Sequence, residues 1–144
     1  MSMNITRNSQ IANRYARALF SAAGEARAAL DEELQKVLKV LEDPLISKVF
    51  YHPRTDRSRK AELVRLMKLS TVLENFLLLV VDKGREPLLP LIQRDFERLV
   101  LEEQNTTIAE VTSAVEMSSE EQAELQRRLS KLTGKRVLIR TQVH

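Results

Sequence analysis

Residues 75–92 read NFLLLVVDKGREPLLPLI, and this stretch decides how the chain folds. In a sequence of which 30% is charged, six apolar residues stand together from Phe76 to Val81 and then give way to a polar turn around Gly84. A membrane-spanning helix needs roughly 20 predominantly apolar residues. The run is far too short for that, so we expect no membrane insertion and a helix that packs against protein.

The composition of the 144-residue chain is typical of a helical protein. Gly and Pro are scarce, with 3 and 4 residues, while Ala, Leu, Glu, Lys and Arg are abundant. The absence of Cys excludes disulfides, thiolate nucleophiles and thiolate metal sites. The N-terminus, MSMNITRNSQ, is polar and lacks the apolar core of a secretory signal. The sequence therefore predicts a soluble, cytoplasmic protein.

Capping, proline and periodicity signals predict six helices before residue 105. Ser9 or Asn8 can cap the first helix, and Gly24 can end it. Thr71 and Glu74 fit a capping box for the fifth. The expected helices cover residues 10–23, 26–41, 45–51, 56–69, 71–84 and 87–104.

After Asn105 the pattern changes to one typical of strands. Residues 107–115 are rich in β-branched residues, and a second strand is predicted at 136–143. Between them Ser118 and Glu121 fit a capping box that opens a helix. The predicted fold is mainly α, with an N-terminal six-helix bundle at residues 1–104 followed by a small β-α-β C-terminal part at 105–144.

The first and fifth predicted helices carry more apolar surface than one core contact needs. On a helical wheel at about 100° per residue, the apolar side chains of each cover an arc of about 200°, against about 100° for an ordinary surface helix. Two explanations are possible. In the first, both helices are central in the bundle and are surrounded by the others. In the second, part of each arc faces outward and forms a groove for a foreign amphipathic helix. In the second case Ala18 and Ala22, beside Tyr15, leave room for that helix. Composition alone leaves both explanations open.

Residues that carry chemistry are scarce. His52 and His144 are the only histidines, and neither has a second ligand at metal-binding spacing. No dinucleotide-binding, P-loop or nucleophile-elbow pattern occurs. We therefore predict no catalytic residue, no metal site, no cofactor and no enzymatic activity. The acidic residues interpreted as capping charges in first turns of helices are Asp31, Glu32, Glu33, Glu120 and Glu121.

The charge balance gives little support for a nucleic-acid partner. The 23 basic and 20 acidic residues are mixed, the net charge is +3 and aromatic residues make up only 4%. A nucleic-acid binder more often shows a stripe of one sign with interleaved aromatic residues. The basic run of Arg54, Arg57, Arg59 and Lys60 is interpreted as a solvated face. A free-standing helical adaptor or a weakly basic nucleic-acid-binding module stays open as the alternative function.

Four segments of the chain resemble the delta subunit of F-type ATP synthases, the bacterial counterpart of the mitochondrial oligomycin-sensitivity-conferring protein. They are IANRYARALFSAA (11–23), FYHPR (50–54), NFLLLVVDKGREPLLPLI (75–92) and AEVTSAVEMSSEEQAELQRRLSKLTGKRVLI (109–139). The resemblance covers nearly the whole chain in the right order. It implies a non-catalytic stator subunit that connects the F1 catalytic head to the peripheral stalk and resists rotation during proton-driven ATP synthesis. It also implies a peripheral location in that complex, at the cytoplasmic face of the bacterial inner membrane.

The resemblance further implies two partners. In the family the N-terminal helix of one alpha subunit docks between the first and fifth helices, and the C-terminal part binds the C-terminal end of the stalk's b subunit. Carried over by position, the alpha-subunit site consists of Ile11, Tyr15, Ala18, Ala22, Val72, Asn75 and Leu79. Family members continue past residues 136–143 with a glycine-containing hairpin and a further helix. We therefore expect the C-terminal part to be incomplete, as a short form or a fragment, which leaves stalk binding by this chain open.

Overall fold

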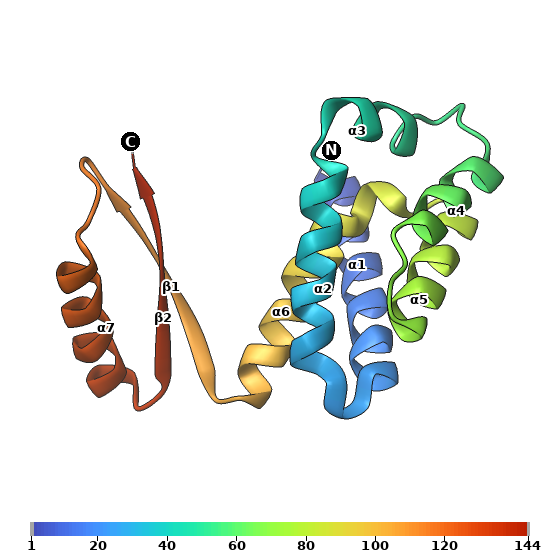
Figure 1. Ribbon diagram of the computed structural model, residues 1–144. Coiled ribbons are helices and arrows are strands. Elements are labelled where there is room, and N and C mark those ends of the chain that lie inside the picture. The colour runs from blue at the N-terminus through green and yellow to red at the C-terminus, as the bar shows by residue number, and fades with distance from the viewer. Residues whose placement is uncertain (1, 144) are drawn as a thin grey trace. The chain divides into compact units, whose positions relative to one another are not determined.

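The computed structural model describes the backbone of residues 2–143 and the side chains of residues 6–143. It is mainly helical, with a small two-stranded parallel sheet (Figure 1). The helices are α1 Ser2–Ala23, α2 Arg27–Leu41, α3 Pro44–Phe50, α4 Arg57–Leu66, α5 Thr71–Asp82, α6 Leu89–Glu103 and α7 Ser119–Thr133, with 3-10 turns at Gly24–Ala26 (η1) and Glu86–Leu88 (η2). The strands are β1 Thr106–Ser113 and β2 Arg136–Val143. Within the described residues, no helix is both long and apolar enough to cross a membrane.

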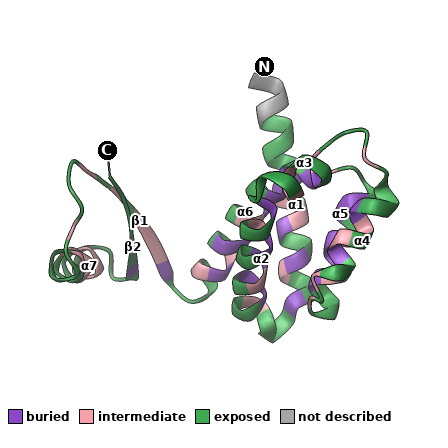
Figure 2. Cartoon of the chain, turned by 45° about the horizontal axis from the view of Figure 1, so that its top comes forward, coloured by how far each residue is buried: buried purple, intermediate pink, exposed green. Residues whose placement is uncertain are grey.

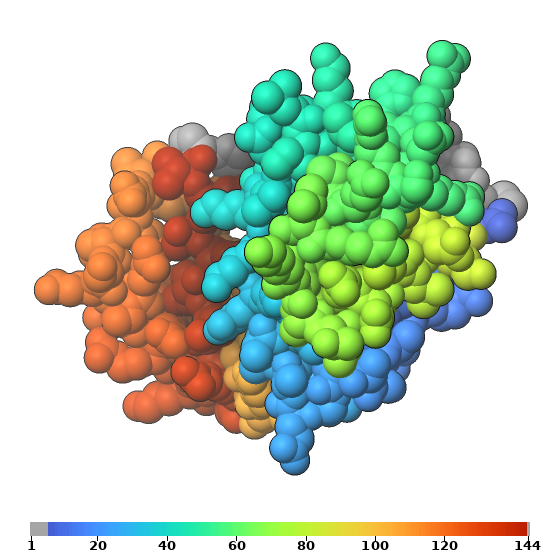
Figure 3. Space-filling model, turned by 45° about the vertical axis from the view of Figure 1, so that its right-hand side comes forward, coloured from blue at the N-terminus to red at the C-terminus, as the bar shows by residue number. Residues whose placement is uncertain are grey.

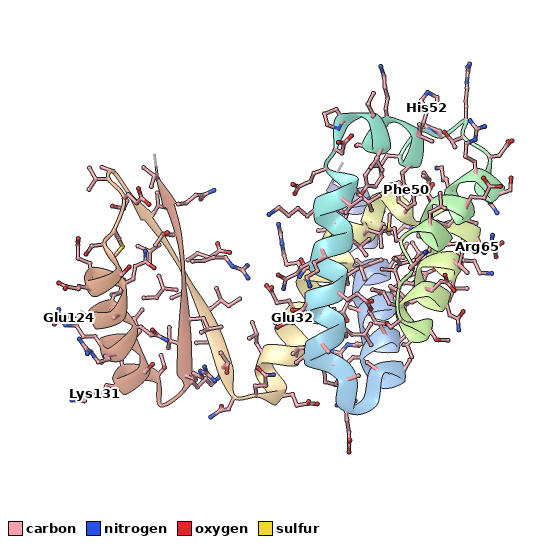
Figure 4. The ribbon with its side chains drawn as sticks, in the orientation of Figure 1. Glu32, Phe50, His52, Arg65, Glu124 and Lys131 are labelled. Carbon is pink, nitrogen blue, oxygen red and sulfur yellow. The ribbon has the colours of Figure 1, made fainter. Side chains whose placement is uncertain are left out.

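The chain divides into two compact units, residues 1–100 and residues 101–144. One apolar core holds the first unit, and each of the helices α1 to α6 contributes to it (Figure 2). Its fully buried side chains include Leu19, Leu34, Phe50, Val64, Leu77 and Phe96. Fully burying an aliphatic or aromatic side chain stabilises a fold by about 1.5–3 kcal/mol. Phe50, labelled in Figure 4, shows how even the short helix α3 is attached to this core.

Two helix boundaries differ by three residues or more from those predicted, and the others agree within two residues. Helix α1 begins at Ser2, so Asn8 and Ser9 lie inside it and are not its caps. No Gly or Pro interrupts the preceding residues, and nothing local stops the helix from extending there. Helix α4 ends at Leu66 and not at Leu69, because the backbone of Lys68 adopts a left-handed conformation with φ of 52°.

The start of α5 is fixed by another helix and not by the predicted capping box. Ser70 is the N-cap residue, and its side chain makes no capping bond to α5. Its backbone N–H and its hydroxyl both donate to the carboxylate of Glu33 on α2. The Thr71–Glu74 capping box is therefore wrong, and Glu33 joins two helices that lie far apart in the sequence.

The capping-charge interpretation is wrong for α2, whose first turn contains no acidic residue. Asp31 is buried and accepts hydrogen bonds from the side-chain amides of Gln35 and Gln93, at 2.9 and 3.3 Å. Gln35 also donates to Glu97 at 3.0 Å, so polar side chains connect α2 to α6. Asp31, Glu32 and Glu33 all lie beyond that first turn. The interpretation is confirmed for Glu120 and Glu121, which lie in the first turn of α7.

Lys60 is not part of a solvated face, as the sequence had indicated. It is buried and forms an ion pair with the buried Glu86 of η2, because α4 turns Lys60 and Val64 toward the interior.

Tyr51, which follows α3, lies near the same buried carboxylate. Burial raises the pKa of the Tyr51 phenol, and the negative charges of Glu42 and Glu86 raise it further.

The second unit contains β1, α7 and β2, in the predicted β-α-β order. The strands pair in parallel from Thr106–Arg136 to Ser113–Val143, so β1 ends two residues before the predicted limit, where this pairing stops. Ser118 forms the predicted capping box with Glu121, and Gly134 ends α7 with φ of 68°. Among the described residues of this unit, Val137 is the only buried apolar side chain. Helix α7 buries none of its residues (Figure 2).

Candidate protein-binding groove

A groove with a cavity volume of about 760 Å³ lies between α1 and α5. It is lined by Ile11, Arg14, Tyr15, Ala18, Leu19, Ala22, Val72, Asn75, Phe76, Leu79, Lys83 and Arg85. All seven residues predicted from the sequence are in this set, so the structure brings them together on one surface. We call this surface the α1/α5 groove.

The floor of the α1/α5 groove is apolar and its walls are accessible. Ile11, Leu19 and Phe76 are buried and form part of the hydrophobic core. Half-buried Tyr15 packs edge to face on Phe76, with ring centroids 6.3 Å apart. The exposed wall residues are Ala18 and Ala22 from α1, and Val72, Asn75 and Leu79 from α5.

The exposures of neighbouring residues explain the wide apolar arcs. On α1, Ala16 is 0% exposed, whereas Ala18, two positions later, is exposed. On α5, Leu77 is 1% exposed and Leu79 is 47% exposed. Each helix therefore has one apolar strip in the core and a second beside it that faces outward. Of the two explanations left open by the sequence, the structure supports the outward-facing groove.

Sequence reasoning missed five lining residues: Arg14, Leu19, Phe76, Lys83 and Arg85. Leu19 and Phe76 belong to both the core and the groove floor, which a helical wheel cannot separate. Arg14 stands on the polar side of the α1 wheel, but its long side chain reaches the groove rim. Lys83 and Arg85 lie beyond the end of α5, where helical periodicity gives no guidance. The sequence feature that could have identified them is the Lys83-Gly84-Arg85 turn, which places two basic residues directly after the helix.

Two further hollows lie on the first unit. One, of about 870 Å³, is bordered by α2, α4 and the start of α5, which lie side by side on the face seen in Figure 3. Leu66, 74% exposed, stands on its rim. The other is polar and includes His52, which is labelled in Figure 4. The His52 ring Nδ1 accepts a hydrogen bond from the backbone N–H of Arg54 at 3.0 Å, so His52 serves the turn after α3, in agreement with a structural role.

The described residues contain no group of three or more His, Cys, Asp or Glu side chains arranged to hold a metal ion. The α1/α5 groove contains no acidic side chain and no histidine. Its chemistry is that of apolar contact bordered by positive charge, which suits the binding of another polypeptide.

The family model of the ATP synthase delta (OSCP) subunit matches residues 11–144. The chain belongs to the ATP synthase delta (OSCP) subunit family. It is 38% identical over 139 residues to ATP synthase subunit delta of Desulforudis audaxviator, covering 92% of this chain and 76% of that protein. The protein of the same name from Desulfitobacterium hafniense (strain DSM 10664 / DCB-2) is 36% identical over 132 residues, covering 88% and 74%.

A solved structure shows the same fold. A chain in the cryo-EM structure of the Toxoplasma gondii mitochondrial ATP synthase hexamer superposes with a TM-score of 0.65 at 22% identity, covering 92% of this chain and 78% of that chain. Family membership decides the function class: the chain is a non-catalytic subunit of an F-type ATP synthase, linking the F1 head to the stator through the peripheral stalk. The free-standing adaptor and the nucleic-acid-binding module are thereby set aside.

Proposed function

We propose that the α1/α5 groove binds the amphipathic N-terminal helix of one alpha subunit of the F1 head. The helices α1 to α6 then act as a six-helix bundle that docks on top of the head. The C-terminal part, residues 105–144, faces the stalk and contacts the C-terminal end of the b subunit. The chain is held in this way at the cytoplasmic face of the bacterial inner membrane, without entering the membrane.

The observation that carries the proposal is the exposure of apolar side chains on the groove walls. Val72 and Leu79 are 37% and 47% exposed although they border a fully formed core. Covering such surface with a partner contributes about 25 cal/mol per Å² of apolar area removed from water. The small side chains of Ala18 and Ala22 allow a helix to approach α1 closely, because interaxial distances depend on the side chains at the contact.

The length of the groove sets the size of the partner segment. From Ile11 to Ala22 the helix α1 spans roughly 16 Å at about 1.5 Å per residue. A partner helix of about three turns fills that length, and it needs apolar residues at i, i+3, i+4 and i+7 on one face. An amphipathic helix at a chain terminus meets both requirements.

The proposal is tested by a pull-down with assembled F1 prepared in two forms, with and without the N-terminal helix of the alpha subunit. We expect the chain to bind the first form and to lose most of its binding to the second. Equal binding to both forms would place the contact with the head elsewhere. The variant Ala18→Asp, on the groove wall, should also lose binding to the first form, and Ala28→Asp, exposed on α2 and outside the groove, serves as its control for nonspecific charge effects.

A further inference from the structure

The rim of the α1/α5 groove carries charge of one sign. Arg14, Lys83 and Arg85 line it together with nine uncharged residues, and the lining includes no Asp or Glu. The hollow bordered by α2, α4 and α5 differs, because its lining includes both acidic and basic residues. The positive rim is therefore a property of this groove and not of the surface of the first unit in general.

The three cations lie toward one end of the groove. Helices α1 and α5 run in opposite directions (Figure 1). The end formed by the last turn of α1 and the first turn of α5 contains Ala22 and Val72, and it carries no charge. Arg14, three residues after Ile11 where the α1 wall of the groove begins, and Lys83 and Arg85, after α5, belong to the opposite end. The groove is thus apolar and neutral at one end and basic at the other.

A helix-terminating motif fixes the backbone of the basic end. Gly84 has φ of +67°, and its N–H donates to the carbonyl of Val81 at 3.0 Å. The N–H of Arg85 donates to the carbonyl of Val80 at 2.9 Å, which completes a Schellman motif. Arg57 donates to the carbonyl of Asp82, so the last turn of α5 is held from outside as well. Lys83 and Arg85 are therefore placed by folded structure and not by a free loop.

The three cations are available to a partner. Within the described part of the chain, Arg14, Lys83 and Arg85 form no ion pair. Glu86, the acidic neighbour of Arg85 in sequence, is buried and paired with Lys60. Arg14 and Lys83 are exposed and Arg85 is half-buried.

We propose that the helix bound in this groove carries acidic side chains beside its apolar stripe, toward the end that meets Arg14, Lys83 and Arg85. This inference rests on the proposed function and adds the direction in which the partner lies. Apolar contact alone is compatible with both directions of a docked helix. Charge complementarity selects one of them, and it raises the association rate while disfavouring partners of the wrong charge.

The test measures the affinity of two synthetic peptides for the full chain. One is the alpha-subunit N-terminal helix from the same source, and the other is the same peptide with every Asp and Glu changed to Asn and Gln. The chain is compared with the double variant Lys83→Gln/Arg85→Gln. The matched control is Lys39→Gln/Lys48→Gln, which removes the same charge at the ends of α2 and α3, outside the groove.

At low salt we expect the double groove variant to bind the native peptide about tenfold more weakly, with the control unchanged. The neutralised peptide is also expected to bind the unmodified chain about tenfold more weakly than the native peptide does. Its affinity for the groove variant should be no lower than its affinity for the unmodified chain. At about 1 M salt, where the screening length falls to about 3 Å, the difference should largely disappear. Equal affinity of the unmodified chain and the groove variant for the native peptide would overturn the inference.

The outcomes separate this inference from the proposed function. If the native peptide binds and Ala18→Asp abolishes binding, but neutralising Lys83 and Arg85 changes nothing, the groove is correct and the charge inference is wrong. If the native peptide does not bind the unmodified chain at all, the proposed function fails and the charge inference fails with it. Circular dichroism confirms for each variant that the helices remain folded.

Discussion

The interactions that stabilise residues 1–100 differ from those that stabilise residues 101–144. In the first unit, every helix from α1 to α6 contributes apolar side chains to one core, and some apolar surface remains exposed at the α1/α5 groove. In the second unit, Val137 is the only buried apolar side chain among the described residues. Apolar burial is the dominant favourable term in folding. The first unit is thus built as a stable platform, and the second relies on local interactions.

Those local interactions are the parallel pairing of β1 with β2, the capping box at Ser118 and the left-handed Gly134. A two-stranded sheet is marginally stable in water, and parallel sheets are normally covered on both faces. The comparison teaches that a stator subunit can combine a unit that has one shared apolar core and an exposed groove with a unit that buries little apolar surface of its own.

The largest expected difference between the units is in hydrogen exchange. The amides of β1 and β2 should exchange at least about a hundredfold faster than those of α5, because local openings need far less free energy where few apolar side chains are buried. Exchange measured by mass spectrometry or NMR on the full chain tests this. Equal protection of residues 107–143 and of α5 would show that the two units do not differ in stability.

A substitution in the first unit should have a large effect that is confined to that unit. Changing Lys60 to Met leaves the buried Glu86 without its partner, and Glu86 Oε2 already lacks a hydrogen bond. The free energy of unfolding should fall by about 3–5 kcal/mol, while the double variant Lys60→Met/Glu86→Leu should recover most of it. Denaturant unfolding of the three proteins measures these changes. A single variant as stable as the unmodified chain would mean that the pair does not act as a buried ion pair.

A smaller effect is expected when a cap in the second unit is removed. Ser118 accepts a hydrogen bond from the N–H of Glu121 at 3.1 Å, and Glu121 accepts one from the N–H of Ser118. Ser118→Ala should destabilise α7 by about 1 kcal/mol, seen as faster exchange in residues 119–133 with no change in α5. If α5 also exchanged faster, the two units would be coupled and the comparison would have to be revised.

The smallest effect concerns alkaline pH. The raised pKa of Tyr51 means that the folded protein keeps the phenol proton at a pH where the unfolded chain has lost it. This contribution to stability is complete below the unfolded pKa of about 10 and is lost as pH rises from there through the folded pKa. The free energy of unfolding should therefore fall more steeply above pH 10 in the unmodified chain than in Tyr51→Phe. Parallel slopes for the two proteins would rule out Tyr51 as the source.

Much of this architecture could be predicted because it is recorded in local patterns. The apolar arcs of α1 and α5, the helix stop at Gly24 and the Ser118 capping box each depend on residues that lie close together in the sequence. The seven groove residues were predicted from their positions on the helical wheels of α1 and α5, together with the family resemblance. Their assembly on one surface followed because both helices place a second apolar strip beside the core strip.

What could not be predicted depends on contacts between distant segments. Lys60 reads as a surface residue until η2 places Glu86 beside it, 26 residues later. Glu33 reads as a first-turn charge, yet it holds Ser70, 37 residues away. The basic rim was missed for a related reason, because α5 ends before Lys83 and only the folded turn directs Lys83 and Arg85 to the groove.

The central claim is that the α1/α5 groove is a free surface of a folded unit and a binding site for a partner helix. Two alanines of one helix test it, since Ala16 is completely buried and Ala18 is exposed on the groove wall. Circular dichroism and titration with the alpha-subunit N-terminal peptide are measured together on Ala16→Asp, Ala18→Asp and the exposed control Ala28→Asp. Ala16→Asp should unfold the first unit, because it places an unpaired carboxylate in the core.

For Ala18→Asp we expect a helical spectrum and a thermal midpoint close to those of Ala28→Asp, together with a loss of peptide affinity of at least about a hundredfold. The loss follows from burying an unpaired charge under the docked helix, which costs several kcal/mol. Ala28→Asp should bind normally. An Ala18→Asp variant that stays folded and binds the peptide as tightly as the unmodified chain would remove Ala18 from the site, and one that melts as early as Ala16→Asp would show that this edge belongs to the core.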